Sequence, residues 1–299
     1  MRALVFEKGR AAVHDRPLPR PRRRFALVRV VLSGICNTDL ELRRGYHGFS
    51  GVPGHEFVGV VEGPASSPRL GKRVVGEINL ACGRCAWCAR GLGRHCPKRT
   101  VLGILRHPGA HAEYLTLPET NLREVPPNLT DEEAVFVEPL AAACEILDQV
   151  EVGAATRTAV LGAGKLGTLC AAVLRNAGAA VTLLKRGGRA RAGSFDLVVE
   201  ATGSPSGMPR AIELVRPRGT IVWKTTHHGP ARFDAAPIVV NEVTVLGSRC
   251  RRFKPALELL AAHRVDVGSL VSAEFPLSQA VRALSHAARR GVRKVLLRP

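Results

Sequence analysis

The chain has 299 residues, of which 45% are hydrophobic and 23% charged, a balance typical of a soluble globular protein of about two domains. No apolar run approaches the about 20 residues that cross a membrane, and no signal-peptide pattern opens the chain, so we expect a cytoplasmic protein without a membrane partner. The net charge of +19 comes mainly from scattered arginines, while aromatic residues make up only 4%, so no specific nucleic-acid partner is expected.

The first part of the chain, which ends near Pro126-Pro127, predicts β-structure. Residues 26–32 and 57–61 are short apolar or alternating runs bounded by Gly, Pro and Ser, the usual limits of strands. Residues 130–133 (Thr-Asp-Glu-Glu) have the composition of a helix start, and residues 138–150 continue with a helical pattern. We expect this helix to connect two domains.

Four cysteines within this first part follow the spacing C-x2-C-x2-C-x7-C: Cys82, Cys85, Cys88 and Cys96. Four thiolates so close in sequence suit one tetrahedral Zn²⁺ whose coordination they complete. Such a closed site has no place for water or substrate, so this zinc would be structural. An iron–sulfur cluster and chance clustering are the alternatives, but half of the chain's 8 cysteines lie here, which argues against chance. Metal ligands and buried thiols suit a reducing compartment.

A second candidate metal group consists of Cys36, the neighbours His55 and Glu56, and the more distant Glu138. A catalytic zinc keeps three protein ligands of mixed type and one open position. A thiolate, an imidazole and one carboxylate would meet that requirement. Each of these residues alone is more often structural, so the grouping is a hypothesis.

After the connecting helix the pattern changes to alternating strands and helices. The predicted strands are residues 158–161, 181–184, 195–200, 220–223 and 243–246, with helical runs at 166–177 and 208–215 between them. This alternation predicts an α/β unit with a parallel, doubly wound sheet. The first strand leads into a glycine-rich turn with the candidate cofactor residues Gly162, Gly164, Lys165, Leu166 and Gly167. A glycine turn between a strand and a helix is typical of dinucleotide binding, with the pyrophosphate at the helix N-terminus.

The second of these strands ends in Lys185-Arg186, where an acid would bond the ribose 2′-hydroxyl of NAD. A basic pair accommodates a 2′-phosphate, so NADP is favoured over NAD, although an arginine-rich composition accounts for part of this signal. Only residues 187–194 precede the next strand, too few for the crossover of about a dozen residues between parallel neighbours. We therefore expect that the usual third strand is missing, that the order is 2-1-4-5-6, and that Arg186, Arg189 and Arg191 protect the new edge.

The end of the chain, from Ala273, predicts a return to the first domain through a helix at 277–290 and a strand at 294–297. The remaining cysteines, Cys144, Cys170 and Cys250, are expected to be buried thiols. His227-His228 follow the fourth strand of the second domain, and they are interpreted as exposed loop histidines.

Taken together, these motifs resemble the zinc-dependent, medium-chain alcohol and polyol dehydrogenases. The resemblance rests on segments in family order over nearly the whole chain: residues 34–39, 54–59, the cysteine lobe, 137–140 and 162–167. It implies a GroES-like, β-rich catalytic domain at 1–137 and a trimmed Rossmann domain at 138–268. Residues 269–299 would return to the catalytic domain.

The resemblance also implies roles for the second metal group. Cys36 and His55 would bind the catalytic zinc, and Glu56 would approach the metal in some states. Glu138 matches a position that is Cys in simple alcohol dehydrogenases and Glu in many polyol-type members, where it would act through water. Asp39 would orient His55 from outside the ligand set.

The mechanism implied is hydride transfer assisted by a Lewis acid. Zinc would lower the pKa of the substrate hydroxyl, Thr38 would take its proton, and the alkoxide would give hydride to the nicotinamide ring. Many relatives have a histidine at the position of Glu41 that ends the proton relay. We therefore expect that Glu41 or solvent carries the proton out here.

The sequence thus predicts a zinc-dependent oxidoreductase that acts on a small secondary alcohol or polyol and its ketone. It would carry one catalytic and one structural Zn²⁺, use NADP or NAD, and form a homodimer or homotetramer as family members do. The alternatives are an NAD-linked primary-alcohol dehydrogenase and a non-catalytic zinc protein that kept the fold and binds nucleotide or polyanion. A DNA-binding zinc protein would need a basic helix beside the cysteine lobe, and the sequence predicts none.

Overall fold

The computed structural model describes residues 1–226 and 229–299, and the chain forms two compact units. Unit 1 comprises residues 1–138 and 253–299, and unit 2 comprises residues 139–252. His227 and His228 lie outside the described residues. The domain limits expected from the sequence stay a prediction, and the compact units differ from them most at the return to unit 1, which begins at Phe253.

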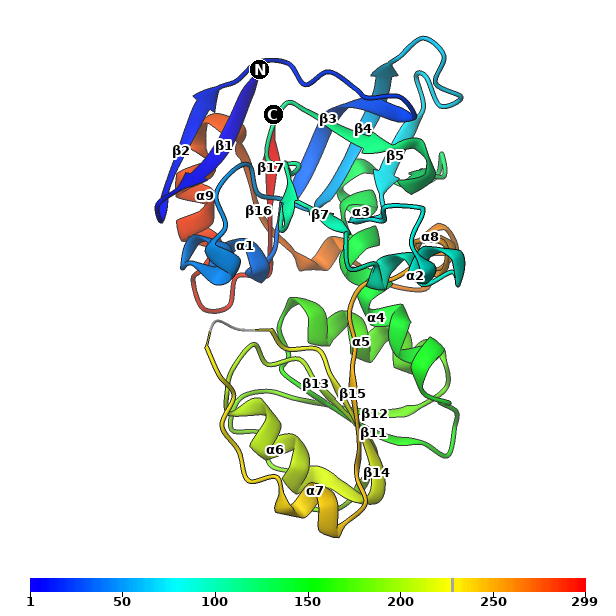
Figure 1. Cartoon of the computed structure of the whole chain (residues 1–299). Coiled ribbons are helices and arrows are strands. Elements are labelled where there is room, and N and C mark those ends of the chain that lie inside the picture. The colour runs from blue at the N-terminus through cyan, green and yellow to red at the C-terminus, as the bar shows by residue number, and fades with distance from the viewer. Residues whose placement is uncertain (227–228) are drawn as a thin grey trace. The chain divides into compact units, whose positions relative to one another are not determined.

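Unit 1 is built around a largely antiparallel sheet, in agreement with its strand-rich sequence (Figure 1). The path of this seven-stranded sheet runs β10 (Leu122–Glu124), β5 (Arg73–Gly76), β4 (Glu56–Gly63), β3 (Phe25–Ile35), β17 (Lys294–Arg298) and β16 (Val271–Pro276), with β9 (Tyr114–Pro118) also paired to β3. The predicted strands at 26–32, 57–61 and 294–297 lie within β3, β4 and β17 and are confirmed. Only β16 and β17 pair in parallel within this sheet.

Smaller elements complete unit 1. The two further sheets are β1 (Arg2–Glu7) with β2 (Arg10–Asp15), and β6 (Asn79–Leu80) with β7 (Thr100–Leu102) and β8 (Arg106–His107). The helices are α1 (Asn37–Arg43), α2 (Ala86–Ala89), α3 (Asp131–Val135), α8 (Lys254–Ala261) and α9 (Ala280–Ala287). Short 3-10 turns span Tyr46–Gly48, Gly93–His95, Glu119–Asn121, Gly268–Leu270 and Leu277–Gln279.

The two ends of the chain pack together inside unit 1. Leu4 and Phe6 of β1, Leu284 of α9 and Leu297 of β17 belong to one buried apolar cluster. This cluster accounts for the return of the last residues to the first domain, because the apolar face of α9 has its partners there. Helix α9 is shorter than the predicted 277–290, because residues 277–279 form a 3-10 turn before it and the helix ends at Ala287.

Unit 2 contains the predicted parallel sheet (Figure 1). Its five strands run in the order β12 (Ala180–Leu184), β11 (Arg157–Leu161), β13 (Phe195–Glu200), β14 (Val215–Trp223) and β15 (Thr244–Gly247), and all their pairings are parallel. The accompanying helices are α4 (Val137–Gln149), which spans the boundary between the units, α5 (Lys165–Asn176), α6 (Gly207–Leu214) and α7 (Ala236–Val240). Among the helices that the structure describes, none is long and apolar enough to cross a membrane.

The sheet order equals 2-1-4-5-6 of the usual six-stranded arrangement, so the missing third strand is confirmed and β12 is an edge. Residues 185–194 run as a plain link to β13, and Ser194 N–H donates to the carbonyl of Leu214 at the end of α6. The guanidinium of Arg175 donates to the edge carbonyl of Val181 at 3.3 Å. One carbonyl of the edge strand therefore accepts a hydrogen bond from an arginine of α5, which the sequence did not suggest. The expected arginines of the link, Arg186, Arg189 and Arg191, are all exposed.

Candidate functional site

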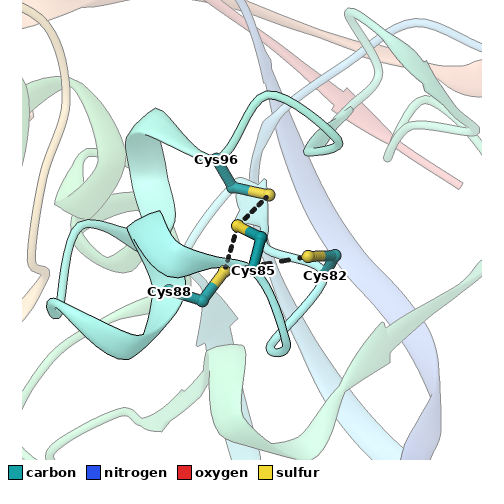
Figure 2. A group of neighbouring side chains, drawn as sticks. All are labelled: Cys82, Cys85, Cys88 and Cys96. Atoms are coloured by element: carbon teal, nitrogen blue, oxygen red, sulfur yellow. Dashed lines mark hydrogen bonds between the residues drawn. The ribbon is translucent and has the colours of Figure 1, made fainter.

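The four cysteines of the lobe converge in the structure as their spacing predicted. Cys82 follows β6, and Cys85 immediately precedes the short helix α2. Cys88 lies within α2, and Cys96 follows a 3-10 turn. Figure 2 shows the four sulfurs pointing toward one another from these turns. The Sγ–Sγ distances are 3.5 Å for Cys85–Cys88, 3.7 Å for Cys85–Cys96 and 3.9 Å for Cys82–Cys88.

These distances suit a tetrahedral zinc site. Zn–S bonds of about 2.3 Å place the sulfurs of a regular tetrahedron about 3.8 Å apart. All four cysteines are free thiols. A backbone hydrogen bond from Arg84 lowers the pKa of Cys82 to about 6, whereas partial burial and the hydrogen bond to Cys85 raise the pKa of Cys88 to about 11. A bound cation would stabilise all four thiolates at once.

The second metal group forms where β3 ends and the neighbouring strand β4 begins. Cys36 follows β3, and Glu56 opens β4, directly across from Gly34 of β3. One ligand atom each from Cys36, His55 and Glu56 lies within 4.8 Å of the others. The structure therefore brings together three of the four residues that the sequence proposed. Glu138, in the first turn of α4, is buried but outside this close group.

The donor set of this group fits a zinc ion. His55 and Glu56 are almost fully buried, whereas Cys36 is only partly buried. Burial lowers the pKa of His55, but the negative charge of Asp39 and the thiol of Cys36 raise it well above its usual value. The charge of Glu138 acts in the same direction. A thiol, an imidazole and a carboxyl group that crowd in this way are the mixed ligands of an open zinc site.

Asp39 links the backbone on both sides of this group. Its carboxylate is fully buried, accepts the N–H of Cys36 at 2.7 Å and that of Gly54 at 3.2 Å, and lies 3.7 Å from Nδ1 of His55. Burial raises the pKa of Asp39, but His55 and His111 lower it to about 2. The carboxylate therefore remains ionised, which allows it to orient His55 as the family resemblance implies.

Lys294 is a member of this region that sequence reasoning missed. Its ammonium forms an ion pair with Oε2 of Glu56, and the two side chains are only 2% and 1% exposed. The ammonium also lies 5.4 Å from the centre of the Phe136 ring. Gly34 leaves the necessary space, because a Cβ there would lie 2.6 Å from Glu56 Oε2. A lysine that starts an apolar strand usually reaches solvent, so no sequence signal pointed to this pair.

The proposed proton relay lies on α1, one turn apart. Thr38 Oγ1 is 3.7 Å from the sulfur of Cys36, close to the candidate metal position. Glu41 follows three residues later, and its carboxylate accepts a hydrogen bond of 2.6 Å from the guanidinium of Arg44. Glu41, the expected end of the relay, therefore forms an ion pair with Arg44.

The glycine turn of unit 2 has the geometry of a phosphate site. Gly162 adopts a φ of 98° at the end of β11, and a Cβ on Gly167 would lie 1.7 Å from the carbonyl oxygen of Gly162. A Cβ on Gly164 would meet nothing within 4 Å, so the N-terminus of α5 is open where a pyrophosphate would approach. Lys165 and Leu166 form the first turn of that helix.

The basic pair lies beside this turn. Gly162 N–H donates to the carbonyl of Leu184, the last residue of β12. Lys185 and Arg186 therefore follow at the carboxyl end of the sheet, as the glycine turn does. Both side chains are exposed. This is the position at which a ribose 2′-substituent is recognised in doubly wound sheets.

The other cysteines have no part in either group. Cys144, Cys170 and Cys250 are buried, which confirms their prediction as buried thiols. Burial raises the pKa of Cys144 to about 12 and that of Cys170 to about 11. Thiols of such high pKa are poor nucleophiles and poor metal ligands.

Comparisons with known proteins agree with this geometry. The family model described as "Alcohol dehydrogenase GroES-like domain" matches residues 23–127, and "Zinc-binding dehydrogenase" matches residues 171–262. D-altritol 5-dehydrogenase of Agrobacterium fabrum is 30% identical over 316 residues, which cover 93% of this chain and 94% of that protein.

Two solved structures are similar over their full length. The alcohol dehydrogenase TADH from Thermus sp. ATN1 has 32% sequence identity and a TM-score of 0.90, with 100% of each chain covered. A protein from Sinorhizobium meliloti 1021, crystallised with NADP, has 28% identity and a TM-score of 0.89, with 100% of this chain and 99% of that chain covered. The likeness therefore extends over both units.

Proposed function

This chain belongs to the zinc-dependent, medium-chain alcohol and polyol dehydrogenases, a family of enzymes, and we propose that it interconverts a small secondary alcohol or polyol and its ketone. The convergence of Cys36, His55 and Glu56 within 4.8 Å carries the proposal, because these three ligand types suit an open zinc site. The similarity to a D-altritol dehydrogenase supports a polyol among the candidate substrates.

In this proposal each residue near the site has a separate task. A zinc ion held by Cys36, His55 and one carboxylate would supply Lewis-acid stabilisation of the negative charge on the substrate oxygen. The Thr38 hydroxyl accepts the substrate proton and passes it on, as its position near the Cys36 sulfur allows. Asp39 orients the His55 ring through Nδ1. Glu41, or solvent beside it, carries the proton out.

The two remaining assignments concern stability and the cofactor. We assign a structural zinc to the cysteine lobe, because three Sγ–Sγ distances of 3.5–3.9 Å match a filled tetrahedron and all four sulfurs lie within 4.8 Å of one another. The glycine turn at 162–167 holds the pyrophosphate of the nicotinamide cofactor. NADP is favoured, because Lys185 and Arg186 offer two exposed cations where the 2′-phosphate lies. The NADP-bound relative supports the same choice.

Assembly and location follow from the same reasoning. The family resemblance supports a homodimer or homotetramer. Eight cysteines without a disulfide, four of them grouped as candidate metal ligands, suit a reducing compartment, so we place the protein in the cytoplasm.

Fluorescence titration of the zinc-loaded protein with NADPH and with NADH tests the proposal. We expect both to bind, NADPH more tightly, and a panel of polyols and secondary alcohols to be oxidised with the tighter cofactor. In a Lys185→Ser/Arg186→Ser variant, NADPH affinity should fall by about tenfold or more while NADH affinity changes little. If neither nucleotide bound at millimolar concentration, the trimmed unit would have lost its cofactor, and the non-catalytic alternative would replace the enzyme.

A further inference from the structure

His111 is a fully buried histidine that packs against the loop in front of His55. Its N–H donates to the carbonyl of Pro53 at 3.0 Å, and its own carbonyl accepts the N–H of Leu4. The imidazole lies directly over Gly54, which has a φ of 99°, and a Cβ at Gly54 would be 2.7 Å from two ring atoms of His111. The ring is therefore fixed in place by backbone on several sides.

Both ring nitrogens of His111 point at polar groups. Nδ1 is 3.0 Å from the hydroxyl of Ser33, which is fully buried in β3. Nε2 is 3.5 Å from Oδ2 of Asp39, and it makes no hydrogen bond in the part of the chain that the structure describes. A buried polar nitrogen is costly unless it is paired, and hydrogen bonds around a catalytic group are often long until the site is fully assembled.

The carboxylate of Asp39 therefore has two equivalent sides. Oδ2 accepts the N–H of Cys36 and faces His111, whereas Oδ1 accepts the N–H of Gly54 and faces His55. Each oxygen has one backbone donor and one imidazole. The orientation of the carboxylate toward His55 thus depends on what holds its other oxygen.

We propose that His111 is a positioning residue for the catalytic zinc site, acting through Asp39 on His55. The Ser33 hydroxyl donates to Nδ1 of His111, which leaves the proton on Nε2 to be donated to Oδ2 of Asp39. Oδ1 is then held toward Nδ1 of His55, and the opposite nitrogen of His55 is directed at the metal position. This inference rests on the proposed function, because it concerns the site of the same reaction.

Two amide variants separate this role from simple packing. His111→Gln can place an N–H near the position of Nε2 and keep the donor to Asp39. His111→Asn is shorter, so it can replace only Nδ1 and its contact with Ser33. Loss of a group that orients a metal ligand typically lowers metal affinity by about 10–100-fold. We expect His111→Asn to lose the zinc of the Cys36 group at about tenfold lower chelator concentration than the wild type, and His111→Gln to stay within about threefold.

The readouts are zinc content during chelator titration, the visible spectrum after replacement by Co²⁺, and the separate values of kcat and KM. The zinc of the cysteine lobe and the affinity for NADPH, whose candidate residues lie in unit 2, serve as internal controls and should not change. Ser33→Ala, a smaller change, should shift zinc retention in the same direction even if the Asn variant folds poorly. A lower kcat for His111→Asn, restored in His111→Gln, is expected.

The possible results distinguish the positioning role of His111 from the proposed dehydrogenase function. If the wild type holds zinc at the Cys36 group and turns over substrate, but Asn, Gln and Ser33→Ala variants all retain that zinc equally, the positioning role is wrong and the function stands. If the wild type binds zinc only at the cysteine lobe, the proposed function is wrong and this inference falls with it.

Discussion

Replacement of Lys294 by methionine would remove one charge from a deeply buried ion pair near the candidate site. Methionine keeps an unbranched apolar stem of similar length, so the packing of the side chain is largely preserved. The lost group is the ammonium that neutralises Glu56 in an environment where both side chains are at most 2% exposed. The carboxylate of Glu56 would then remain buried without its cation.

The expected cost follows from that burial. Breaking a buried ion pair by removing one partner destabilises a protein by about 3–5 kcal/mol, because the remaining charge is uncompensated. Arg298 lies on the same strand and pairs with Glu274 at 2.6 Å, but its side chain is 45% exposed. Arg298→Met is therefore a matched control and should cost no more than about 1 kcal/mol.

Urea unfolding of unit 1 measures the difference. The chain has 2 tryptophans, and Trp87 lies in unit 1 whereas Trp223 lies in unit 2. In a Trp223→Phe background, fluorescence therefore reports on unit 1 alone, which avoids treating two units as one transition. We expect a larger cost in the presence of a chelator, because a zinc ion beside Glu56 would partly neutralise it. A Lys294→Met/Glu56→Gln variant should recover much of the loss.

One result would refute this reasoning. If Lys294→Met cost no more than Arg298→Met, with and without chelator, the charge of Glu56 would have another source of compensation, and the argument from the buried pair would be wrong.

Three further predictions concern the lobe, the glycine turn and pH. Cys85→Ser should remove one zinc per chain, whereas Cys250→Ser should remove none; elemental analysis that found equal zinc in both would contradict a metal in the lobe. Gly164→Ala should weaken NADPH binding by about tenfold, measured by titration, and leave stability unchanged. Gly167→Ala should destabilise unit 2 by at least about 1–3 kcal/mol, measured by calorimetry, because its Cβ would lie 1.7 Å from a carbonyl oxygen. Partial burial raises the pKa of Asp196, but hydrogen bonds from two arginines hold it well below its usual value. The stability that Asp196 contributes is thus fully present above the unfolded-state pKa of about 3.9 and is lost only as the pH falls toward the much lower folded-state pKa. The urea midpoints of wild type and Asp196→Asn should therefore differ at pH 7, and this difference should begin to shrink only below about pH 4.

The parts of this protein that depend on short stretches of chain could be predicted from the sequence. The cysteine lobe needs only four residues within one loop, and the glycine turn only a strand, a few residues and a helix start. The trimmed sheet follows from a length limit, since residues 187–194 are too few to cross over a parallel sheet. In each case the physical constraint acts between residues that are close along the chain, so spacing is sufficient evidence.

The tertiary structure decided which distant residues support the candidate site. Glu56 and Lys294 are 238 positions apart, and they meet only because β17 pairs with β3 beside β4. His111 reaches Asp39 because its segment bonds to the loop before His55. In the sequence a lysine before an apolar strand and a single histidine both suggest ordinary surface or core residues. Their partners are fixed by sheet register and burial, which arise from packing across the whole unit rather than from any local pattern.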